Sequence, residues 1–205
     1  LQNRVTPTGD IIATPHRGLL MGNRGGAFHL PNRTLGSRRW ASRQWIACVL
    51  AFKDRHRAAM MQPHRYTELF FLDEATALAA GHRPCFECRR RDAEQFAMLW
   101  AHARNWPAPA RAPEMDLVLQ AERVDRHGQK ITFMAQLGSL PIGTIIQLPN
   151  APEPTCYLVQ DDRLLAWSPA GYAGATPLNR RRQVEVLTPR SIVAVLSAGY
   201  HPMLH

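Results

Sequence analysis

Two cysteines separated by two residues, Cys85 and Cys88, are the residues whose type and spacing point most directly to chemistry. Two thiolates at this spacing can bind along one edge of the tetrahedron of ligands that zinc prefers. They follow a proline turn and precede an expected helix. The helix N-terminus and the nearby Arg83, Arg89 and Arg90 should therefore lower the thiol pKa values. We expect a structural zinc site here. The alternative is a redox pair like that of thioredoxin, which a strand normally precedes.

The residues around this pair resemble a known metal-binding module. Residues 70–90, FFLDEATALAAGHRPCFECRR, contain an aromatic residue, a short alanine-rich helix and the pattern Gly-x-Arg-Pro-Cys-x-x-Cys. This order is similar to the second half of the Ada-type module, which occurs in alkylation-damage repair proteins and is appended to some nucleases. The resemblance covers about a tenth of the chain. It implies that the two cysteines are the second pair of zinc ligands.

The first pair of ligands is less complete. In such modules it comes from an upstream hairpin, either as two cysteines or as His-x-x-x-Cys. Here His29 stands in the expected place, but Arg33 occupies the position of the cysteine, and the next cysteine is Cys48. The resemblance then implies His29 and Cys48 as the remaining ligands. His56 or His64 could replace His29, and Cys48 could instead be an ordinary core residue.

In the repair proteins, one zinc-bound cysteine of the first pair accepts a methyl group from a DNA phosphotriester. Cys48 is the candidate for that role here, but it lies in an expected strand, WIACVLAF, where its thiol would be poorly exposed. The resemblance therefore implies metal binding more strongly than methyl transfer. The whole chain is also similar to a group of bacterial proteins that share the pattern NRVTP…GNRGG…ELFFLDEATALAAGHRPC, and this similarity implies no function.

The positive charge of the chain lies mostly in its first half. The net charge is +9, from 25 basic and 16 acidic residues. Residues 1–100 contain 15 basic and 8 acidic residues, whereas residues 101–205 contain 10 and 8. All but two of the basic residues are arginines, whose planar guanidinium pairs with phosphate or guanine. A basic field confined to one half favours a polyanion as the partner.

Between Gly22 and Arg65, arginines are interleaved with aromatic residues, so phosphate neutralisation and base stacking could occur on one surface. The sequence therefore predicts DNA, either duplex or locally opened, as the partner. Gly25 and Gly26 would let backbone amides approach a phosphate. The candidate DNA-binding residues are Arg24, Arg38, Arg39, Arg43, Arg55, Arg57, Arg65 and Trp40. A solvated arginine face over tryptophans in the core is the alternative.

Catalysis has a weaker basis. Glu68 lies in the apolar segment TELFF, where a carboxylate is costly unless it is paired. It is therefore the candidate catalytic acid, with a salt bridge to a neighbouring arginine as the structural alternative. Asp73 is expected to cap a helix instead. The sequence contains no complete His-Asn-His, Ser-His-Asp or glycine-rich nucleotide motif.

The elements that must position these residues change character along the chain. Residues 45–53 and 66–72 are expected to form strands, joined as a hairpin by the basic segment between them. A short helix over 74–80 should begin at Asp73, and a longer one at Asp92. Beyond a proline-rich break, we expect a helix over 114–124 and five short strands within 131–188. A last helix should have Thr188 as its cap and Pro189 at its first position.

These elements predict an α+β fold with two units. Residues 1–106 would form a zinc-stabilised, nucleic-acid-binding domain with a strand hairpin and two helices. Residues 107–113 would be a linker, and 114–205 a smaller β-rich domain. No apolar run is long enough to span a bilayer and the first residues do not resemble a signal peptide, so we expect a cytoplasmic protein.

The sequence therefore predicts a zinc-containing DNA-binding protein that recognises damaged or modified DNA in repair, modification or defence. The alternative is a DNA-processing enzyme, a nuclease or DNA glycosylase, that uses the zinc module as a scaffold. A redox switch on the cysteine pair is a third possibility.

Overall fold

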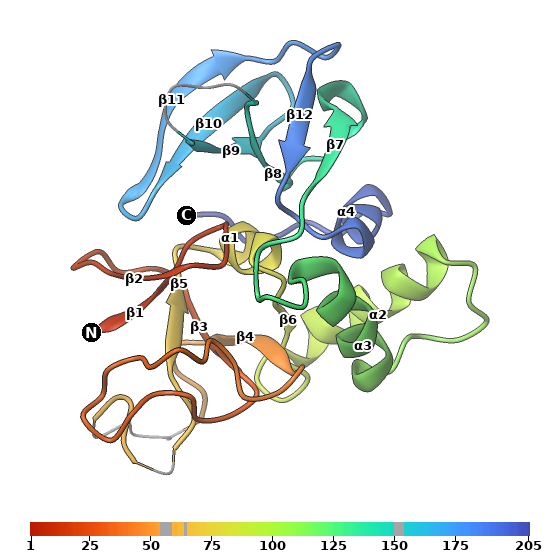
Figure 1. Cartoon of the computed structure of the whole chain (residues 1–205). Helices are drawn as coiled ribbons and strands as arrows, with labels where there is room; N and C mark the ends of the chain where they lie inside the picture. The colour runs from red at the N-terminus through yellow and green to blue at the C-terminus, as the bar shows by residue number, and fades with distance from the viewer. Residues whose placement is uncertain (54–58, 64, 150–153) are drawn as a thin grey trace.

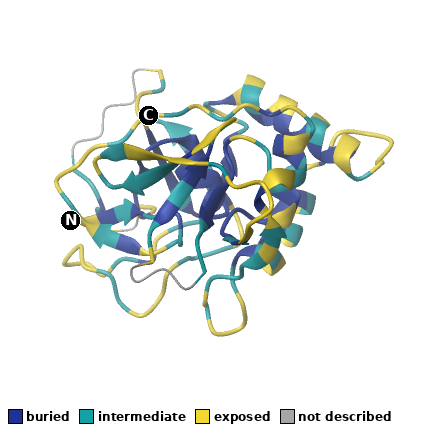
Figure 2. Cartoon of the chain, turned by 90° about the horizontal axis from the view of Figure 1, so that it is seen from above, coloured by how far each residue is buried: buried dark blue, intermediate teal, exposed yellow. Residues whose placement is uncertain are grey.

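The computed structural model describes residues 1–53, 59–63, 65–149 and 154–205. It confirms a mixed α+β architecture in which two six-stranded sheets are accompanied by four helices. The sheets lie one above the other, with α1 and α4 between them and α2 and α3 to one side (Figure 1). Seen from above, buried residues gather at the centre, and the outer faces of the helices at the side are exposed (Figure 2).

The first sheet contains the strands of the N-terminal half. Its order is β2 (Ile11–Ala13), β1 (Gln2–Val5), β5 (Leu69–Phe71), β3 (Leu20–Arg24), β4 (Trp45–Val49) and β6 (Arg83–Pro84). The predicted hairpin between β4 and β5 is wrong, because β3 lies between them and pairs antiparallel with both. Gly22 makes this close packing possible, since a Cβ there would lie 2.0 Å from the Ile46 carbonyl oxygen and 2.9 Å from the Phe71 ring.

Helix α1 (Glu74–Ala79) is buried over its whole length. Ala77 belongs to the core under the first sheet, whereas Ala75 and Ala79 belong to a core shared with the second sheet. Leu78 packs into a third core, formed by the other helices. Its alanine side chains are small enough to let both sheets approach it, and its buried polar residues, Glu74 and Thr76, form hydrogen bonds.

The two acids at the start of α1, Asp73 and Glu74, accept hydrogen bonds from distant parts of the chain. Asp73 caps the helix as predicted, accepting from the backbone N–H of Thr76 at 2.9 Å, and it also accepts from the Tyr172 hydroxyl at 2.7 Å. Glu74 accepts from the Tyr200 hydroxyl at 2.7 Å and pairs with Arg89 at 2.8 Å. Both carboxylates are buried and serve the contact between the C-terminal segment and α1.

The other helices are α2 (Arg90–Ala103), α3 (Ala112–Arg123) and α4 (Arg190–Ser197). Two predicted helix starts are wrong. Asp92 lies within the first turn of α2 and accepts from the Arg89 side chain at 2.7 Å, so it does not cap the helix. Pro189 is the cap residue of α4, and the Thr188 hydroxyl instead accepts from the backbone N–H of Ile145 at 2.9 Å.

One hydrophobic core contains residues from both sides of the segment 107–113, which was predicted as a linker. Phe96 of α2, Met115 of α3 and Ile192 of α4 belong to one buried cluster. Arg83 of β6 and Asp116 of α3 form a buried, bidentate ion pair, with both nitrogen-to-oxygen distances at 2.8 Å. The division at 107–113 stays a prediction, and the two halves that it separates share a core.

The second sheet contains the strands of the C-terminal half. Its order is β11 (Gly171–Pro177), β10 (Arg163–Ser168), β9 (Cys156–Val159), β8 (Ile145–Gln147), β12 (Gln183–Val186) and β7 (Phe133–Gln136). Strands β8, β9 and β12 lie within the predicted segments TIIQL, CYLVQ and QVEVL, and β10 begins one residue before the predicted LLAWS. Strand β7 overlaps the predicted ITF only at Phe133. Strand β11 was not predicted, because GYAGATP contains two glycines and a proline, which are uncommon in strands, and it lies at the edge of the sheet.

Candidate metal centre and basic pocket

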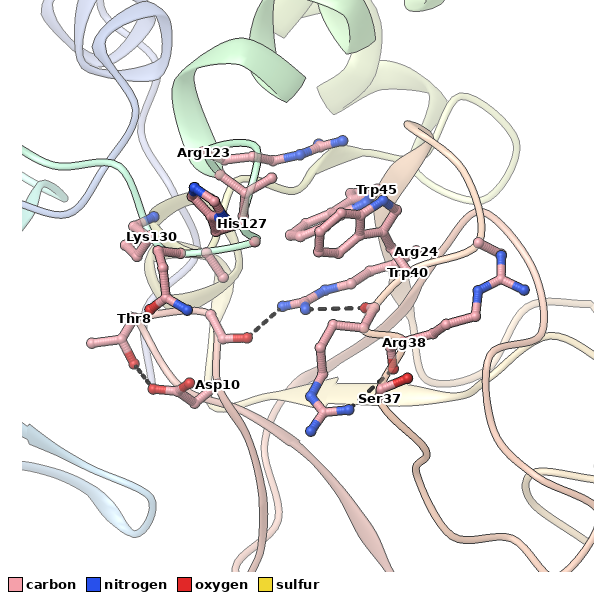
Figure 3. Close-up of a pocket in the computed structure, with 17 residues that line it drawn as sticks. Thr8, Asp10, Arg24, Ser37, Arg38, Trp40, Trp45, Arg123, His127 and Lys130 are labelled. Carbon is pink, nitrogen blue, oxygen red and sulfur yellow. Dashed lines mark hydrogen bonds between the residues drawn. The ribbon is translucent and has the colours of Figure 1, made fainter.

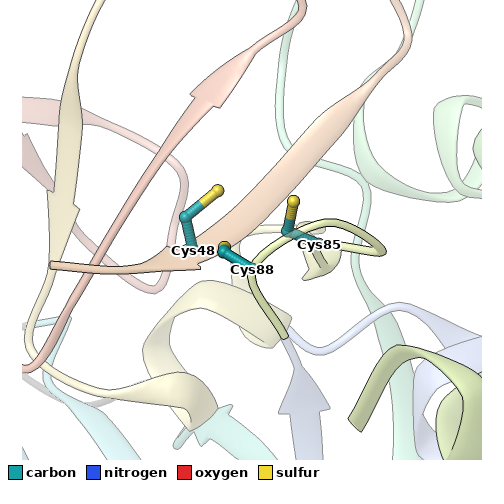
Figure 4. A group of neighbouring side chains, drawn as sticks. All are labelled: Cys48, Cys85 and Cys88. Atoms are coloured by element: carbon teal, nitrogen blue, oxygen red, sulfur yellow. The ribbon is translucent and has the colours of Figure 1, made fainter. Parts of the chain in front are cut away.

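The structure brings three cysteines into one group. The sulfur atoms of Cys48, Cys85 and Cys88 all lie within 4.8 Å of one another. Cys48 is on β4, whereas Cys85 and Cys88 lie on the loop between β6 and α2, and the three side chains converge (Figure 4). Strand β6 pairs in parallel with β4, and the backbone N–H of Cys85 donates to the Ala47 carbonyl at 3.0 Å. This pairing places the CxxC loop against the strand that carries the third sulfur.

The three thiols are free and share protons unequally. The Cys48 thiol donates to the other two sulfurs, which raises its own pKa, and burial raises it further. The same hydrogen bond lowers the pKa of Cys85 to about 5 against the opposing effect of burial, with help from the backbone N–H groups of Cys88 and Glu87. The pKa of Cys88 is lowered mainly by Cys48, with help from the backbone N–H of Val49. Cys85 is therefore a thiolate near neutral pH, and Cys88 is more acidic than an ordinary cysteine.

The arginines expected to produce this effect have other partners. Arg83 pairs with Asp116, Arg89 with Glu74 and Asp92, and Arg90 with Glu94. The acidity of the thiols comes from the sulfur-to-sulfur hydrogen bonds and from backbone donors at the end of β4 and in the loop before α2.

This group could hold a metal ion. Zinc binds thiolate sulfur at about 2.3 Å, so sulfurs that share a tetrahedral ion are about 3.8 Å apart. The separations in the group are compatible with that value. Thiolates are soft ligands, so they favour zinc over magnesium or calcium. The metal would fix β4 to the loop that begins α2.

His29 does not lie in this group. Its Nδ1 is 2.8 Å from the Thr67 hydroxyl, and its Nε2 is 3.2 Å from the Gln62 carbonyl, so both ring nitrogens already have partners. Within the described ranges, no histidine or carboxylate joins the three cysteines. The alternatives His56 and His64 lie outside the described residues.

A polar cavity of about 610 Å³ opens beside the start of β4 (Figure 3). The side chains that line it come from widely separated segments of the chain, from Thr8 to Lys130. They include Thr8, Asp10, Arg24, Ser37, Arg38, Arg39, Trp40, Trp45, Arg123, His127, Gln129 and Lys130. Five of these are cationic arginines or lysine, and Asp10 is the one carboxylate among the lining residues. We call this cavity the basic pocket.

The floor of the basic pocket is an indole held between two guanidinium groups. The carbon atoms at the centres of the Arg24 and Arg123 guanidiniums lie 3.9 and 4.0 Å from the Trp45 ring centroid. Arg24 donates to the carbonyls of Gly9, at 2.8 Å, and Arg39, at 3.3 Å. Such stacking is favourable but does not neutralise charge. Asp10 acts on Arg24 and Asp116 on Arg123, in each case without a salt bridge among the described residues.

The Arg123 side chain packs closely against Gly81, the glycine of the GHRPC motif. Gly81 has a φ of +88°, and a Cβ there would lie 2.7 Å from the Arg123 side chain. Arg123 donates to the carbonyls of Gly81, at 3.0 Å, and Arg43, at 2.7 Å. Its Nε is buried and has no partner in the described part of the chain.

Lys130 adds a third cation, and its ammonium donates to the Ala79 carbonyl. Burial and repulsion from Arg24 and Arg123 lower the pKa of Lys130 to about 7. Burial also lowers the pKa values of Arg24 and Arg123 to about 9. Among the described residues, none of the three forms a salt bridge with a carboxylate. Buried charges of one sign that lack counterions are costly, so they favour an anion in the pocket.

Trp40 forms part of the wall because its loop is fastened to the end of β3. The Arg24 carbonyl accepts from the backbone N–H groups of Ala41, at 2.9 Å, and Ser42, at 3.2 Å. The Gly25 N–H, predicted to approach a phosphate, instead donates to the Asn23 side chain at 2.9 Å. The glycine pair thus shapes the loop and does not line the basic pocket.

The predicted DNA-binding residues divide into three sets. Arg24, Arg38, Arg39 and Trp40 line the basic pocket. Arg43 and Arg65 are exposed outside it. Arg55 and Arg57 lie outside the described residues.

Glu68, the predicted catalytic acid, belongs neither to the cysteine group nor to the pocket lining. It is buried, and it accepts from the backbone N–H of Met61 at 2.7 Å. This contact gives Glu68 a structural role, and its catalytic role stays a prediction.

Sequence reasoning missed the part of the pocket that comes from the second half of the chain, namely Arg123, His127 and Lys130. The sequence position of Arg123 could have indicated that it is buried. Met115 and Leu119 form the buried stripe of α3, and Arg123 follows them at the same four-residue spacing. An arginine on a buried stripe is costly unless another element requires it.

Comparisons with known proteins add no family assignment, since no family model, curated protein or solved structure matches the chain. Among the described residues, no helix is both long enough and apolar enough to cross a membrane.

Proposed function

We propose that this chain is a zinc-containing DNA-binding protein that recognises damaged or modified DNA in repair, modification or defence. The observation that carries the proposal is the set of cations from distant segments that converge on one pocket with a single lining carboxylate. Excess positive charge attracts phosphate, and the exposed Arg38 and Arg39 at the rim of the basic pocket can contact a DNA backbone.

The cysteine group supports this function indirectly. Strand β4 begins with Trp45 in the basic pocket and reaches the metal-binding group at Cys48. An ion held by the three thiolates would supply no chemistry to DNA. It would fix β4 and the start of α2, so that the pocket keeps its shape before DNA binds.

DNA binding by the metal-loaded full chain tests the proposal. We expect affinity for duplex DNA to fall steeply as salt rises, because bound phosphates release counterions. We also expect a duplex carrying a modified or damaged base to bind more tightly than the plain duplex. Affinity that does not change with salt would contradict phosphate contacts, and equal affinity for all duplexes would contradict recognition of damage.

The same incubation separates a binding protein from an enzyme. DNA recovered from the mixture is run on a denaturing gel with and without alkali. Intact strands support a binding protein. Breaks that form without alkali would instead indicate a nuclease, and breaks that need alkali a glycosylase.

A further inference from the structure

The basic pocket is a partly open cavity rather than a flat charged face, and this difference limits what it can bind. A duplex backbone lying across the rim would contact Arg38 and Arg39, which are exposed. It would leave empty a cavity of about 610 Å³. Cavities of this size are typical of sites for a small molecule or for one extruded group.

The charge pattern of the pocket selects an anionic group. Arg24 and Arg123 are 2% and 0% exposed, so they act through their field rather than through direct contact. Lys130 lines the pocket, but its ammonium is buried and donates to the Ala79 carbonyl, so it also acts mainly through its field. The fields of these three groups, together with the exposed Arg38 and Arg39 at the rim, favour a phosphate near the Trp45 end of the pocket.

The side of the pocket formed by Trp40 and Trp45 favours a planar group, such as a base, next to that phosphate. Trp40 is half-buried and lies 5.8 Å from Trp45, centroid to centroid, with the rings inclined at 50°. Gly128 faces its ring, since a Cβ there would lie 3.2 Å from Trp40. The turn around Gly128 is fixed by Asp125, which accepts from the backbone N–H groups of His127 and Gln129 at 2.8 Å.

We propose that the basic pocket binds a single nucleotide unit, with its phosphate beside Lys130 and the rim arginines and its base against Trp40. This inference rests on the proposed function in one respect, that the nucleotide comes from DNA. A base in a duplex can enter this cavity only if it leaves the helical stack, and this costs least where the base is mispaired. The pocket would therefore be the element that distinguishes altered DNA from intact DNA.

The test compares four probes on the metal-loaded full chain, namely inorganic phosphate, a free 5′-mononucleotide, a fully paired duplex and the same duplex with one mismatch. We expect the mononucleotide to bind more tightly than phosphate, and the mismatched duplex about tenfold or more tighter than the paired one. Trp40→Leu should remove both preferences. Stacking on an aromatic side chain contributes about 1–3 kcal/mol per base, which corresponds to a loss of about 5- to 150-fold.

Trp106→Leu is the matched control, because Trp106 is 37% exposed and lies outside the pocket. It should leave both preferences unchanged. Thermal unfolding and zinc content must be the same for both variants, so that a folding defect is not read as lost stacking. If Trp40→Leu fails this check, Trp40→Phe takes its place, and it should retain most of both preferences.

The outcomes distinguish a failure of the pocket inference from a failure of the proposed DNA binding. A preference for the mononucleotide without any duplex binding would support the pocket and contradict DNA as the source. Salt-dependent duplex binding with no mismatch preference and no effect of Trp40→Leu would overturn the pocket inference and leave DNA binding intact. Equal binding of phosphate and mononucleotide in both variants would show an anion site only and would also overturn the inference.

Discussion

The cysteine group and the basic pocket lie toward opposite ends of one strand, yet they were visible in the sequence to very different degrees. Two of the three sulfurs are three positions apart in the chain, and a single pairing of β6 with β4 adds the third. The pocket draws on segments from Thr8 to Lys130. A site that depends on local spacing can be read from sequence, whereas a site assembled by tertiary packing cannot.

Removal of a sulfur should have the largest effect on either region. We expect Cys85→Ser to lower zinc affinity by more than about 100-fold, because even outer-shell changes cost 10- to 100-fold. Zinc content after dialysis measures this loss. Cys156→Ser is the matched control, because Cys156 is equally buried but lies on β9, outside the group. Equal zinc content in Cys85→Ser and Cys156→Ser would contradict the assignment of Cys85 as a zinc ligand.

Loss of the ion pair between the two regions should have the next largest effect. Arg83 precedes the CxxC loop, and Asp116 lies on α3, the helix that carries Arg123 into the pocket. Asp116→Ala leaves Arg83 buried without a partner, which costs about 3–5 kcal/mol of unfolding free energy. Denaturant unfolding measures the cost. Asp162→Ala removes an exposed partner of Arg163 and should change stability little. Equal effects would mean that the buried pair does not stabilise the fold.

The pocket, unlike the cysteine group, should respond to pH through Lys130. An anion favours the charged amine, so it raises the pKa of Lys130 in the complex above its free value of about 7. The contribution to affinity is therefore fully present below pH 7 and is lost as the pH rises through the raised value in the complex. Binding of an oligonucleotide should weaken by up to about tenfold per pH unit over that window.

Lys130→Gln supplies the control, because it removes the group that titrates and should make affinity flat across this window. The other ionisable groups that act on Lys130 are Arg24, Arg123 and Cys156, and burial raises the pKa of Cys156 to about 11. A pH step that persists in Lys130→Gln would assign the titration to another group.

The smallest effect is expected from loss of an exposed arginine at the rim of the basic pocket. Arg38→Gln should remove one phosphate contact and reduce the slope of log affinity against log salt by about 1. Arg181→Gln removes the same charge from an exposed position beside the second sheet and should leave the slope unchanged. Identical slopes for the two variants would place the DNA outside the basic pocket.

The fold was predictable where local patterns dominate. The Asp73 cap, the alanine-rich helix and most strands follow from residue type and spacing. Strand order was not predictable, because the insertion of β3 between β4 and β5 depends on the bare backbone at Gly22. The same limit applies to His29, the predicted ligand that lies outside the cysteine group. Its ring nitrogens contact Thr67 and Gln62, and sequence spacing does not show these contacts.

The most direct test of the central claim, that Cys48, Cys85 and Cys88 hold one zinc ion, is X-ray absorption at the zinc edge on the purified full chain. We expect about one zinc per chain, with three sulfur neighbours at about 2.3 Å and one lighter ligand completing the tetrahedron. Absence of zinc, or a metal with fewer than three sulfur neighbours, would contradict the metal centre on which the shape of the basic pocket depends.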